Sequence, residues 1–409
     1  MNKVNPHKLF SKDFIAVNIM IFLAYLNLAV FFTFAPYLAA KGFRPGIIGI
    51  IISAFSLSGL IIRPLISPFL FPSNARKWIA ISTLVDVASL FLYLVANTIW
   101  PLLILRFVHG AAYVCMAASK MALIVAFIPP KKASLAFSFT SASMLLPMAI
   151  VPPLLNPLTQ LLGGFDKVLS ATGLLMLVIY PLLLLIHPKD AQGNELKIKE
   201  KHISHKEYFK DLSQPKILVV LAIILVLFVC IAASFMYCAQ FGAYIELANP
   251  GLFFTIAIAV MILVRLVGGQ FMDRFKASML IAVSLAVLVL AYAGLAVTKG
   301  PVLFYAMAPI CGLCWGVAHP VLHAVLFRIS KPRLQSLNQN FGTEMVDGGF
   351  FLGPIIGAAM IGTSHFHLFF IFCAAITGLS LLGFLLVLPE LRKHDHLTIS
   401  LSHEKSSNE

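Results

Sequence analysis

The sequence has too few charged residues to cover the surface of a soluble protein of its size. Only 11% of the 409 residues are charged, whereas 60% are hydrophobic and the mean hydropathy is +0.94. This composition excludes a soluble globular fold and places the chain in a lipid bilayer. Acidic residues are scarcer than basic ones, 16 against 30, which gives a net charge of +14. The basic residues lie in short loops between apolar runs, so they favour contact with a membrane surface, and we expect no binding of nucleic acid.

Several motifs of other functional classes are also missing. The sequence contains no H-E-x-x-H, no paired aspartate boxes and no nucleotide-binding P-loop. We therefore expect no enzymatic activity, no cofactor and no direct coupling to ATP. A recognisable soluble output domain is also missing, which argues against a signalling receptor. All six cysteines lie inside apolar runs, so neither a disulfide framework nor a metal site is expected from them.

Long apolar runs recur along the whole chain. A span needs about 20 apolar residues, and the sequence predicts twelve, near 14–38, 47–70, 78–97, 101–128, 134–157, 168–187, 216–245, 251–271, 277–297, 301–328, 334–361 and 365–388. The predicted fold is all-α, with two pseudo-symmetric bundles of six transmembrane helices. The predicted organisation is an N-terminal bundle at 1–187, a basic cytoplasmic linker at 188–215, a C-terminal bundle at 216–390 and a disordered cytoplasmic tail at 391–409.

The distribution of lysine and arginine predicts the orientation. Of the 30, 22 fall in the segments that share a side with both termini and the central linker. The opposite side holds only four, and the other four lie within spans. Because positive loops stay on the cytoplasmic side, both termini are predicted to be cytoplasmic, in a plasma or bacterial inner membrane.

The two halves show a weak internal repeat at an offset of 200 to 202 residues. Arg63 matches Arg265 and Gly110 matches Gly312, and further matches are Thr98 with Thr298, Pro101 with Pro301 and Pro153 with Pro354. Their equivalent places in the two halves indicate a parallel duplication, and transporters with such halves bind substrate between them.

A motif after the eighth span carries a family resemblance. Gly269 is followed four residues later by Asp273-Arg274, and the first half has only a degraded copy with Ser67 and Phe71 at the Gly and Asp positions. This motif resembles the loop motif of the major facilitator superfamily. The resemblance covers nearly the whole chain and implies secondary active transport by a monomer. It also implies a cytoplasmic charge lock, with Gly269, Asp273, Arg274, Arg63 and Arg265 in gating or structural roles; Arg63 and Arg265 could instead extend to the membrane surface.

Two other motifs bear on coupling and direction. Arg106-Phe-Val-His109-Gly110 resembles the family's Arg-x-x-x-Gly motif, whose arginine is linked to proton coupling. A run of glycines with Gly353-Pro354 in span eleven resembles the motif that many antiporters carry in span five. Because the motif is displaced here, export and proton-symport uptake both stay open, with export preferred.

An ionisable side chain inside a membrane span costs free energy, so its presence points to a partner or a function. Arg106, His109, Tyr113 and Lys120 fall within a sector of about 60° on span four, given about 100° per residue. Such a face would bind an anionic substrate, or its cations could pair with acids inside the membrane. In span eleven, Glu344 and Asp347 share a face with Asn340. They are candidates for binding the coupling proton, with a static ion pair as the alternative.

Other polar residues complete the candidate set. The resemblance makes spans one, four, seven and ten line the cavity, so Asn27, Tyr237 and Gln240 are candidate substrate contacts. His319 and His323 in span ten are candidate proton carriers or substrate donors, and two ligands alone do not make a metal site. Asp86, in span three, is assigned to structural pairing. The resulting hypothesis is proton-coupled transport of a small, anionic organic solute such as a metabolite, siderophore or drug.

Overall fold

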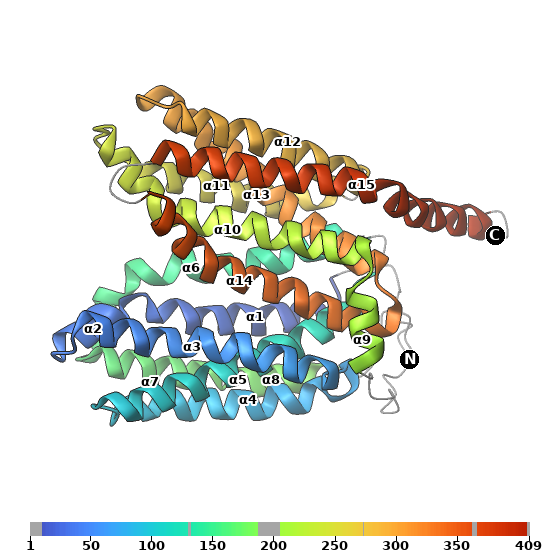
Figure 1. The fold of residues 1–409 in the computed structure, drawn as a ribbon. Coiled ribbons are helices and arrows are strands. Elements are labelled where there is room, and N and C mark those ends of the chain that lie inside the picture. The colour runs from blue at the N-terminus through green and yellow to red at the C-terminus, as the bar shows by residue number, and fades with distance from the viewer. Residues whose placement is uncertain (1–9, 130–131, 187–204, 273, 362–365, 407–409) are drawn as a thin grey trace. The chain divides into compact units, whose positions relative to one another are not determined.

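The fold is helical throughout the part of the chain that the structure describes. This computed structural model describes residues 10–129, 132–186, 205–272, 274–361 and 366–406 (Figure 1). The helices are α1 (Lys12–Val30), η1 (Phe31–Thr33), α2 (Phe34–Ala40), α3 (Pro45–Ile66), η2 (Ser67–Phe69), α4 (Pro72–Leu92), α5 (Ile99–Phe127), α6 (Ala133–Leu162), α7 (Phe165–Met176), α8 (Ile179–Leu185), α9 (His205–Leu212), α10 (Pro215–Tyr244), α11 (Leu252–Met272), α12 (Ala277–Ala296), α13 (Pro301–Ile329), η4 (Pro332–Leu334), α14 (Gln335–Ile361) and α15 (Phe366–Ser406).

Each of the twelve predicted spans coincides with helix. Span one is the sequence α1, η1 and α2, span two is α3 with η2, and span six is α7 with α8; every other span corresponds to one long helix. Within the described ranges, nine stretches are long and apolar enough to cross a membrane by length and composition. The spans outside those nine are α4, α11 and α14, and α4 and α14 carry Asp86, Glu344 and Asp347. The all-α fold with twelve membrane helices is thus confirmed.

The chain divides into two compact units. Unit 1 comprises 1–129 and 140–205, and unit 2 comprises 130–139 and 206–409. This division follows the predicted bundles, except that the first residues of α6 group with unit 2. Within unit 1, α1, α3 and α4 all pack on α5. Within unit 2, α10 packs on α14, α11 on α13, and α12 on both α13 and α15.

Two repeat-related glycines make the same kind of close contact in both units. A methyl group added at Gly110 of α5 would collide with the backbone of Phe55 in α3, and one added at Gly312 of α13 would collide with the backbone of Ala257 in α11. Both pairs are related by an offset of 202 residues. The internal repeat seen in the sequence therefore corresponds to the same helix packing in each unit, because only glycine permits so close an approach.

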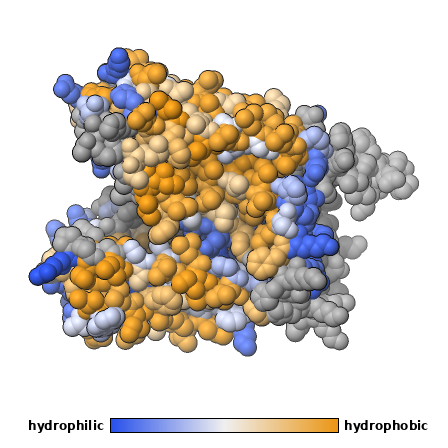
Figure 2. Space-filling model, viewed as in Figure 1, coloured by the Kyte–Doolittle hydropathy of each residue, from blue (hydrophilic) through white to orange (hydrophobic). Residues whose placement is uncertain are grey.

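The outward-facing side chains are those expected of helices in lipid. Many large apolar residues are exposed along the helices, for example Leu161, Leu184, Leu290, Val302 and Leu386. On the face drawn in Figure 2, each unit is mostly hydrophobic, and hydrophilic residues gather toward the helix ends. In water such a surface would aggregate, whereas in a bilayer it needs no other partner.

Two predicted irregular segments contain helix. The predicted linker at 188–215 includes α9, and its Asp211 is buried within unit 2. The helix α15 continues to Ser406, so most of the tail predicted to be disordered is helical in the structure. Both predictions used polar composition alone. Composition does not distinguish a solvated loop from a polar helix that packs on, or extends from, a larger unit.

Candidate functional site

The polar face predicted for span four is buried inside unit 1. Arg106, His109, Tyr113 and Lys120 of α5 have exposed fractions of 4%, 1%, 7% and 2%. A helical spacing of three, four and seven residues keeps them on one side of α5, toward α1, α3 and α4. The shared face follows from the sequence, and its contacts come from three other helices.

Arg106 lies among aromatic rings. The guanidinium carbon is 4.4 Å from the ring centroid of Phe31, 4.6 Å from that of Phe55 and 5.1 Å from that of Phe34. These distances are within the range of cation–π attraction, which strengthens where water is excluded. The Nε and Nη1 donors of Arg106 have no hydrogen-bond acceptor among the described residues. The rings thus stabilise the charge, and two N–H groups can still bind an acceptor.

A break in span one places Phe31 against Arg106. The α-helix ends at Val30, and the chain continues as a 3-10 turn at Phe31–Thr33 before α2 begins. Pro36 has no N–H to donate to the carbonyl four residues earlier, so the regular α-helical ladder cannot continue unbroken through this stretch. The local change of pitch turns the ring of Phe31 toward Arg106 and also toward His109, with a centroid separation of 5.2 Å from the imidazole.

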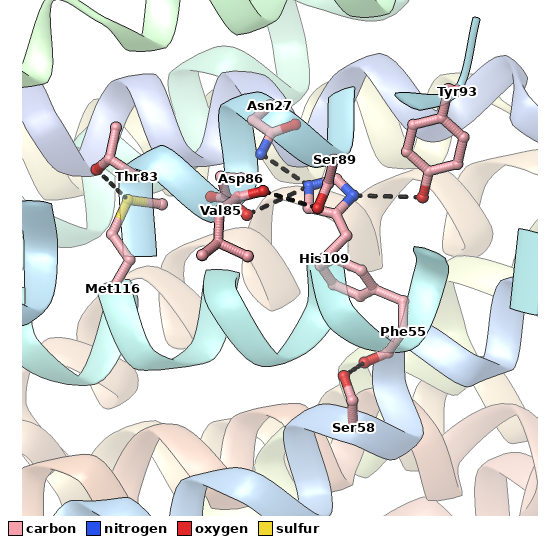
Figure 3. Close-up of polar contacts among 10 residues, drawn as sticks. All are labelled: Asn27, Phe55, Ser58, Thr83, Val85, Asp86, Ser89, Tyr93, His109 and Met116. Atoms are coloured by element: carbon pink, nitrogen blue, oxygen red, sulfur yellow. Dashed lines mark hydrogen bonds and ion pairs between the residues drawn. The ribbon is translucent and has the colours of Figure 1, made fainter. Parts of the chain in front are cut away.

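His109 is the centre of a buried polar cluster (Figure 3). Its Nε2 lies 3.1 Å from Asn27 Nδ2 and 3.5 Å from Asp86 Oδ1, and its Nδ1 lies 3.4 Å from the Tyr93 hydroxyl. Asn27 comes from α1, and Asp86 and Tyr93 come from α4 and its C-terminal cap. Nε2 can accept a hydrogen bond from Asn27 or donate one to Asp86, so the position of its proton selects between these partners.

Lys120 and Asp86 extend this cluster. The Lys120 ammonium donates to the carbonyl of Met20 in α1 over 3.2 Å and attracts Asp86 electrostatically. Asp86 is completely buried, and neither of its oxygens accepts a hydrogen bond within the described residues. Asp86 pairs with His109 and Lys120 as an acid in this span is expected to do, but its place in this polar cluster was not predicted from the sequence. Asp86 is the sole acidic residue inside a span of the first half, which holds three in-span cations; this imbalance was the available signal.

The repeat-related arginines are buried in their own units. Arg63 and Arg265 have exposed fractions of 2% and 4%, so the alternative in which they extend to the membrane surface is wrong. Arg265 Nη2 lies 3.3 Å from His319 Nδ1 and 3.5 Å from the carbonyl oxygen of Trp315, which ties α11 to α13. Asp273 lies outside the described residues and the surroundings of Gly269 are not described, while Arg274 is exposed. The charge lock therefore stays a prediction.

The histidines of span ten form a second polar group, within unit 2. The rings of His319 and His323 are 4.8 Å apart. His323 Nδ1 lies 2.7 Å from Gln339 Oε1, and Gln339 Nε2 donates back to the His323 carbonyl over 2.9 Å. These bonds give His323 two satisfied contacts with α14. No cluster of three metal-binding side chains occurs among the described residues.

The remaining candidates differ in burial. Glu344 and Asn340 are buried in α14, whereas Asp347 is half-buried. Tyr237 packs against Gly357 and Phe369, and Tyr113 contacts Tyr25 and Phe55. Gln240 is exposed. Their assignments as substrate contacts or proton carriers stay predictions.

Solved structures show the same fold. FucP, a Major Facilitator Superfamily transporter crystallised in the outward conformation, aligns with a TM-score of 0.74 at 13% identity over 91% of this chain and 97% of that chain. The human organic anion transporter MFSD10 (TETRAN) aligns at 0.70 and 14% identity, covering 91% and 99%. A bacterial homologue of the iron transporter ferroportin aligns at 0.72 and 12% identity, covering 91% and 98%.

The sequence comparison is consistent with these structures. A search of curated proteins finds no match. The family model described as Major Facilitator Superfamily matches residues 17–343, which is most of the chain. Together with the twelve membrane helices and the shared fold, this match shows that the chain is a multi-pass membrane transporter that belongs to the Major Facilitator Superfamily.

Proposed function

We propose that this chain is a proton-coupled secondary transporter of a small organic solute that carries an anionic group. The observation that supports the proposal is the state of Arg106, a buried guanidinium with two N–H donors that have no acceptor among the described residues. A carboxylate or phosphate group is the acceptor that such donors bind best, because a hydrogen bond between two charged groups is stronger than one between neutral groups. Lys120 adds a second positive charge on the same face of α5.

The other predicted roles are part of the same proposal. Glu344 and Asp347 are proposed to bind the coupling proton together with Arg106. His109, Tyr113, Asn27, Tyr237, Gln240, His319 and His323 are proposed to contact substrate, and Gly269, Asp273, Arg274, Arg63 and Arg265 to control conformational exchange. The transporter is proposed to act as a monomer in the plasma or bacterial inner membrane, with both termini cytoplasmic.

Transport driven by an imposed pH gradient tests the proposal. Purified protein is reconstituted in proteoliposomes that contain a pH-sensitive dye, and carboxylates such as lactate and succinate are compared with their neutral amides. We expect proton movement that depends on the carboxylates and is much smaller with the amides. Binding of a solute without any flux would instead identify a receptor, and equal responses to acids and amides would remove the anionic group from the proposal.

Direction is tested in the same vesicles. Export by exchange is favoured because span eleven resembles that of efflux members, and proton symport is the alternative. A solved structure of an E. coli fucose:proton symporter also aligns with this chain, at a TM-score of 0.68 and 14% identity. In symport, a carboxylate that enters carries protons inward and acidifies the lumen. In exchange, its entry releases protons from the lumen. The sign of the dye response decides between the two.

A further inference from the structure

Asp86 is a buried acid that the proposed function does not yet use. It is 0% exposed, in the middle of α4, and both of its oxygens lack a hydrogen-bond donor among the described residues. A buried carboxylate is expensive unless it is paired or takes up a proton. Ionisable residues inside a membrane protein mark ion or proton pathways by default.

The neighbour of Asp86 is a base. His109 Nε2 lies 3.5 Å from Asp86 Oδ1, and both side chains are shielded from water. A single added proton can reside on the carboxyl oxygen or on the imidazole nitrogen, and its transfer between them forms one O–H or N–H bond as it breaks the other. No other reactant is needed. The two groups therefore titrate as a pair.

Asn27 couples the state of this pair to α1. Its Nδ2 faces His109 Nε2 over 3.1 Å, which requires that nitrogen to be an acceptor, while its Oδ1 has no partner in the described part of the chain. When His109 carries a proton on Nε2, rotation of the Asn27 amide presents Oδ1 as an acceptor instead. The position of the proton thus changes a contact between α1 and α5.

The charged and titratable groups facing the pair come from α4 and α5. They are Lys120, which attracts Asp86, and Arg106, which repels a charged His109, together with Tyr93 and Cys115. The helices α7 and α8 also pack on α4. Asp166 and Lys167 lie at the start of α7, and Gly173, further along that helix, lies against Leu90 and Phe91 of α4. The Tyr180 hydroxyl of α8 donates a hydrogen bond to the Ala80 carbonyl of α4.

From this geometry we infer that Asp86 and His109 form a proton-binding site inside unit 1, and that an added proton strengthens binding of an organic anion at Arg106. The inference rests on the proposed function and specifies its coupling. Arg106 lies one helical turn from His109, so a proton that neutralises Asp86 or charges His109 makes the surroundings of Arg106 more positive. By reciprocity, the anion strengthens proton binding by the same factor, about tenfold or more. Such positive coupling is that of symport, the alternative to the export by exchange that the resemblance of span eleven to efflux members favours.

The first experiment needs no substrate. The full-length protein in lipid nanodiscs is titrated with acid while the infrared carbonyl band of protonated carboxylic acids is recorded. We expect one component of the titrating band to disappear in Asp86→Asn and to persist in Asp166→Asn, the matched control at the start of α7. His109→Gln, which leaves the carboxyl group in place, should move the midpoint by about one pH unit or more. An unchanged band in Asp86→Asn together with an unchanged midpoint in His109→Gln overturns the inference.

The second experiment separates this inference from the proposed function. Binding of lactate and succinate is measured at several pH values for the wild type, Asp86→Asn and Asp166→Asn. We expect affinity to rise about tenfold toward low pH in the wild type and Asp166→Asn, and to lose most of this dependence in Asp86→Asn. Wild-type proteoliposomes with no solute-dependent proton flux would refute the proposed function alone. Wild-type coupling that persists in Asp86→Asn would refute the role of Asp86 alone.

Discussion

At the scale of single residues, Arg106 shows how aromatic rings can stabilise a buried charge while some of its hydrogen-bond donors stay available to a ligand. The rings of Phe31, Phe34 and Phe55 surround its guanidinium without accepting hydrogen bonds from its edge. A carboxylate partner from the protein would instead have occupied the donors. The aromatic surroundings therefore hold the cation in place and leave its Nε and Nη1 donors to a ligand.

Replacing Arg106 tests this reading. We expect Arg106→Ala to weaken binding of carboxylates by about tenfold to a hundredfold, the equivalent of a lost hydrogen bond to a charged group. Neutral amides of the same solutes should lose far less. Arg44→Ala, which removes an exposed arginine, is the matched control. Isothermal titration with both ligand types gives the comparison, and equal losses for acids and amides would assign Arg106 a structural role.

A separate prediction concerns Glu344 and Asp347, the two acidic residues of α14. We expect Glu344→Gln or Asp347→Asn to abolish flux driven by a pH gradient, because neither amide can carry a proton, while the protein still inserts and binds solute. Exchange of labelled solute at equal pH on both sides should continue, since it moves no net protons. Measuring both fluxes in the same vesicles checks this; normal gradient-driven flux in both variants would remove α14 from proton coupling.

Helical periodicity could predict which residues of α5 share a face, but not what that face meets. Arg106, His109 and Lys120 follow from spacing alone. The contact of His109 with Asp86 depends on the rotation of α4 about its own axis, and the position of Phe31 depends on a local break in span one. A single sequence fixes neither quantity, because many rotations of an apolar helix are compatible with lipid. For the same reason, the burial of Arg265 against His319 was not expected.

At the scale of helices, glycine spacing sets the closest packing in unit 2. Gly349, Gly353 and Gly357 recur every four residues along α14 and face α10. A methyl group at Gly353 would lie 2.6 Å from the carbonyl oxygen of Val229. The two backbones approach closely because nothing but hydrogen separates them, and such contacts supply much of helix association in membranes.

This packing predicts a clear difference between two glycine substitutions. We expect Gly353→Ala to destabilise the protein by about 1–3 kcal/mol, as overpacking does. Gly383→Ala in α15 should change stability little, because an added methyl there meets no atom within 4 Å. Thermal unfolding in detergent, followed by size-exclusion chromatography, compares the two. Equal melting temperatures for both variants would show that α14 can move away from α10 at no cost.

The helix α9 offers a similar comparison between buried and exposed contacts. Asp211 is buried and accepts hydrogen bonds from Gln214 over 2.6 Å and from Asn338 of α14 over 2.9 Å. Glu207, about one turn earlier, makes an exposed ion pair with Arg333 over 3.4 Å. The linker is thus attached to unit 2 by one buried and one solvent-exposed interaction.

We expect these two contacts to differ in strength. Asp211→Ala should destabilise the protein by about 1–3 kcal/mol, because it leaves buried donors unpaired. Glu207→Ala should have an effect below about 1 kcal/mol, as exposed ion pairs do. Limited proteolysis of the linker should accelerate in the first variant and not in the second. Similar protection in both would show that α9 is held by its apolar residues instead.

At the scale of the whole molecule, hydropathy predicted the fold and duplication predicted its division. Twelve apolar runs and one long polar linker correspond to the helices and to two compact units. Composition performs well here because a bilayer permits few alternatives to a helix. It says less about 205–212 and 391–406, where polar residues allow either a solvated loop or a helix, and the structure has helix.

The cost of moving charge across a bilayer predicts the orientation of the chain in the membrane. The sides defined by the twelve spans hold 22 and four basic residues, and moving so many lysines and arginines across a bilayer is strongly disfavoured. We expect a fluorescent protein fused after the C-terminus to fluoresce in a bacterial host, because it folds in the cytoplasm. Alkaline phosphatase inserted at the exposed turn around Gly42 should be active, because it requires the periplasm. The reverse pair of results would invert the topology and, with it, the side on which the Asp273 motif could act as a lock.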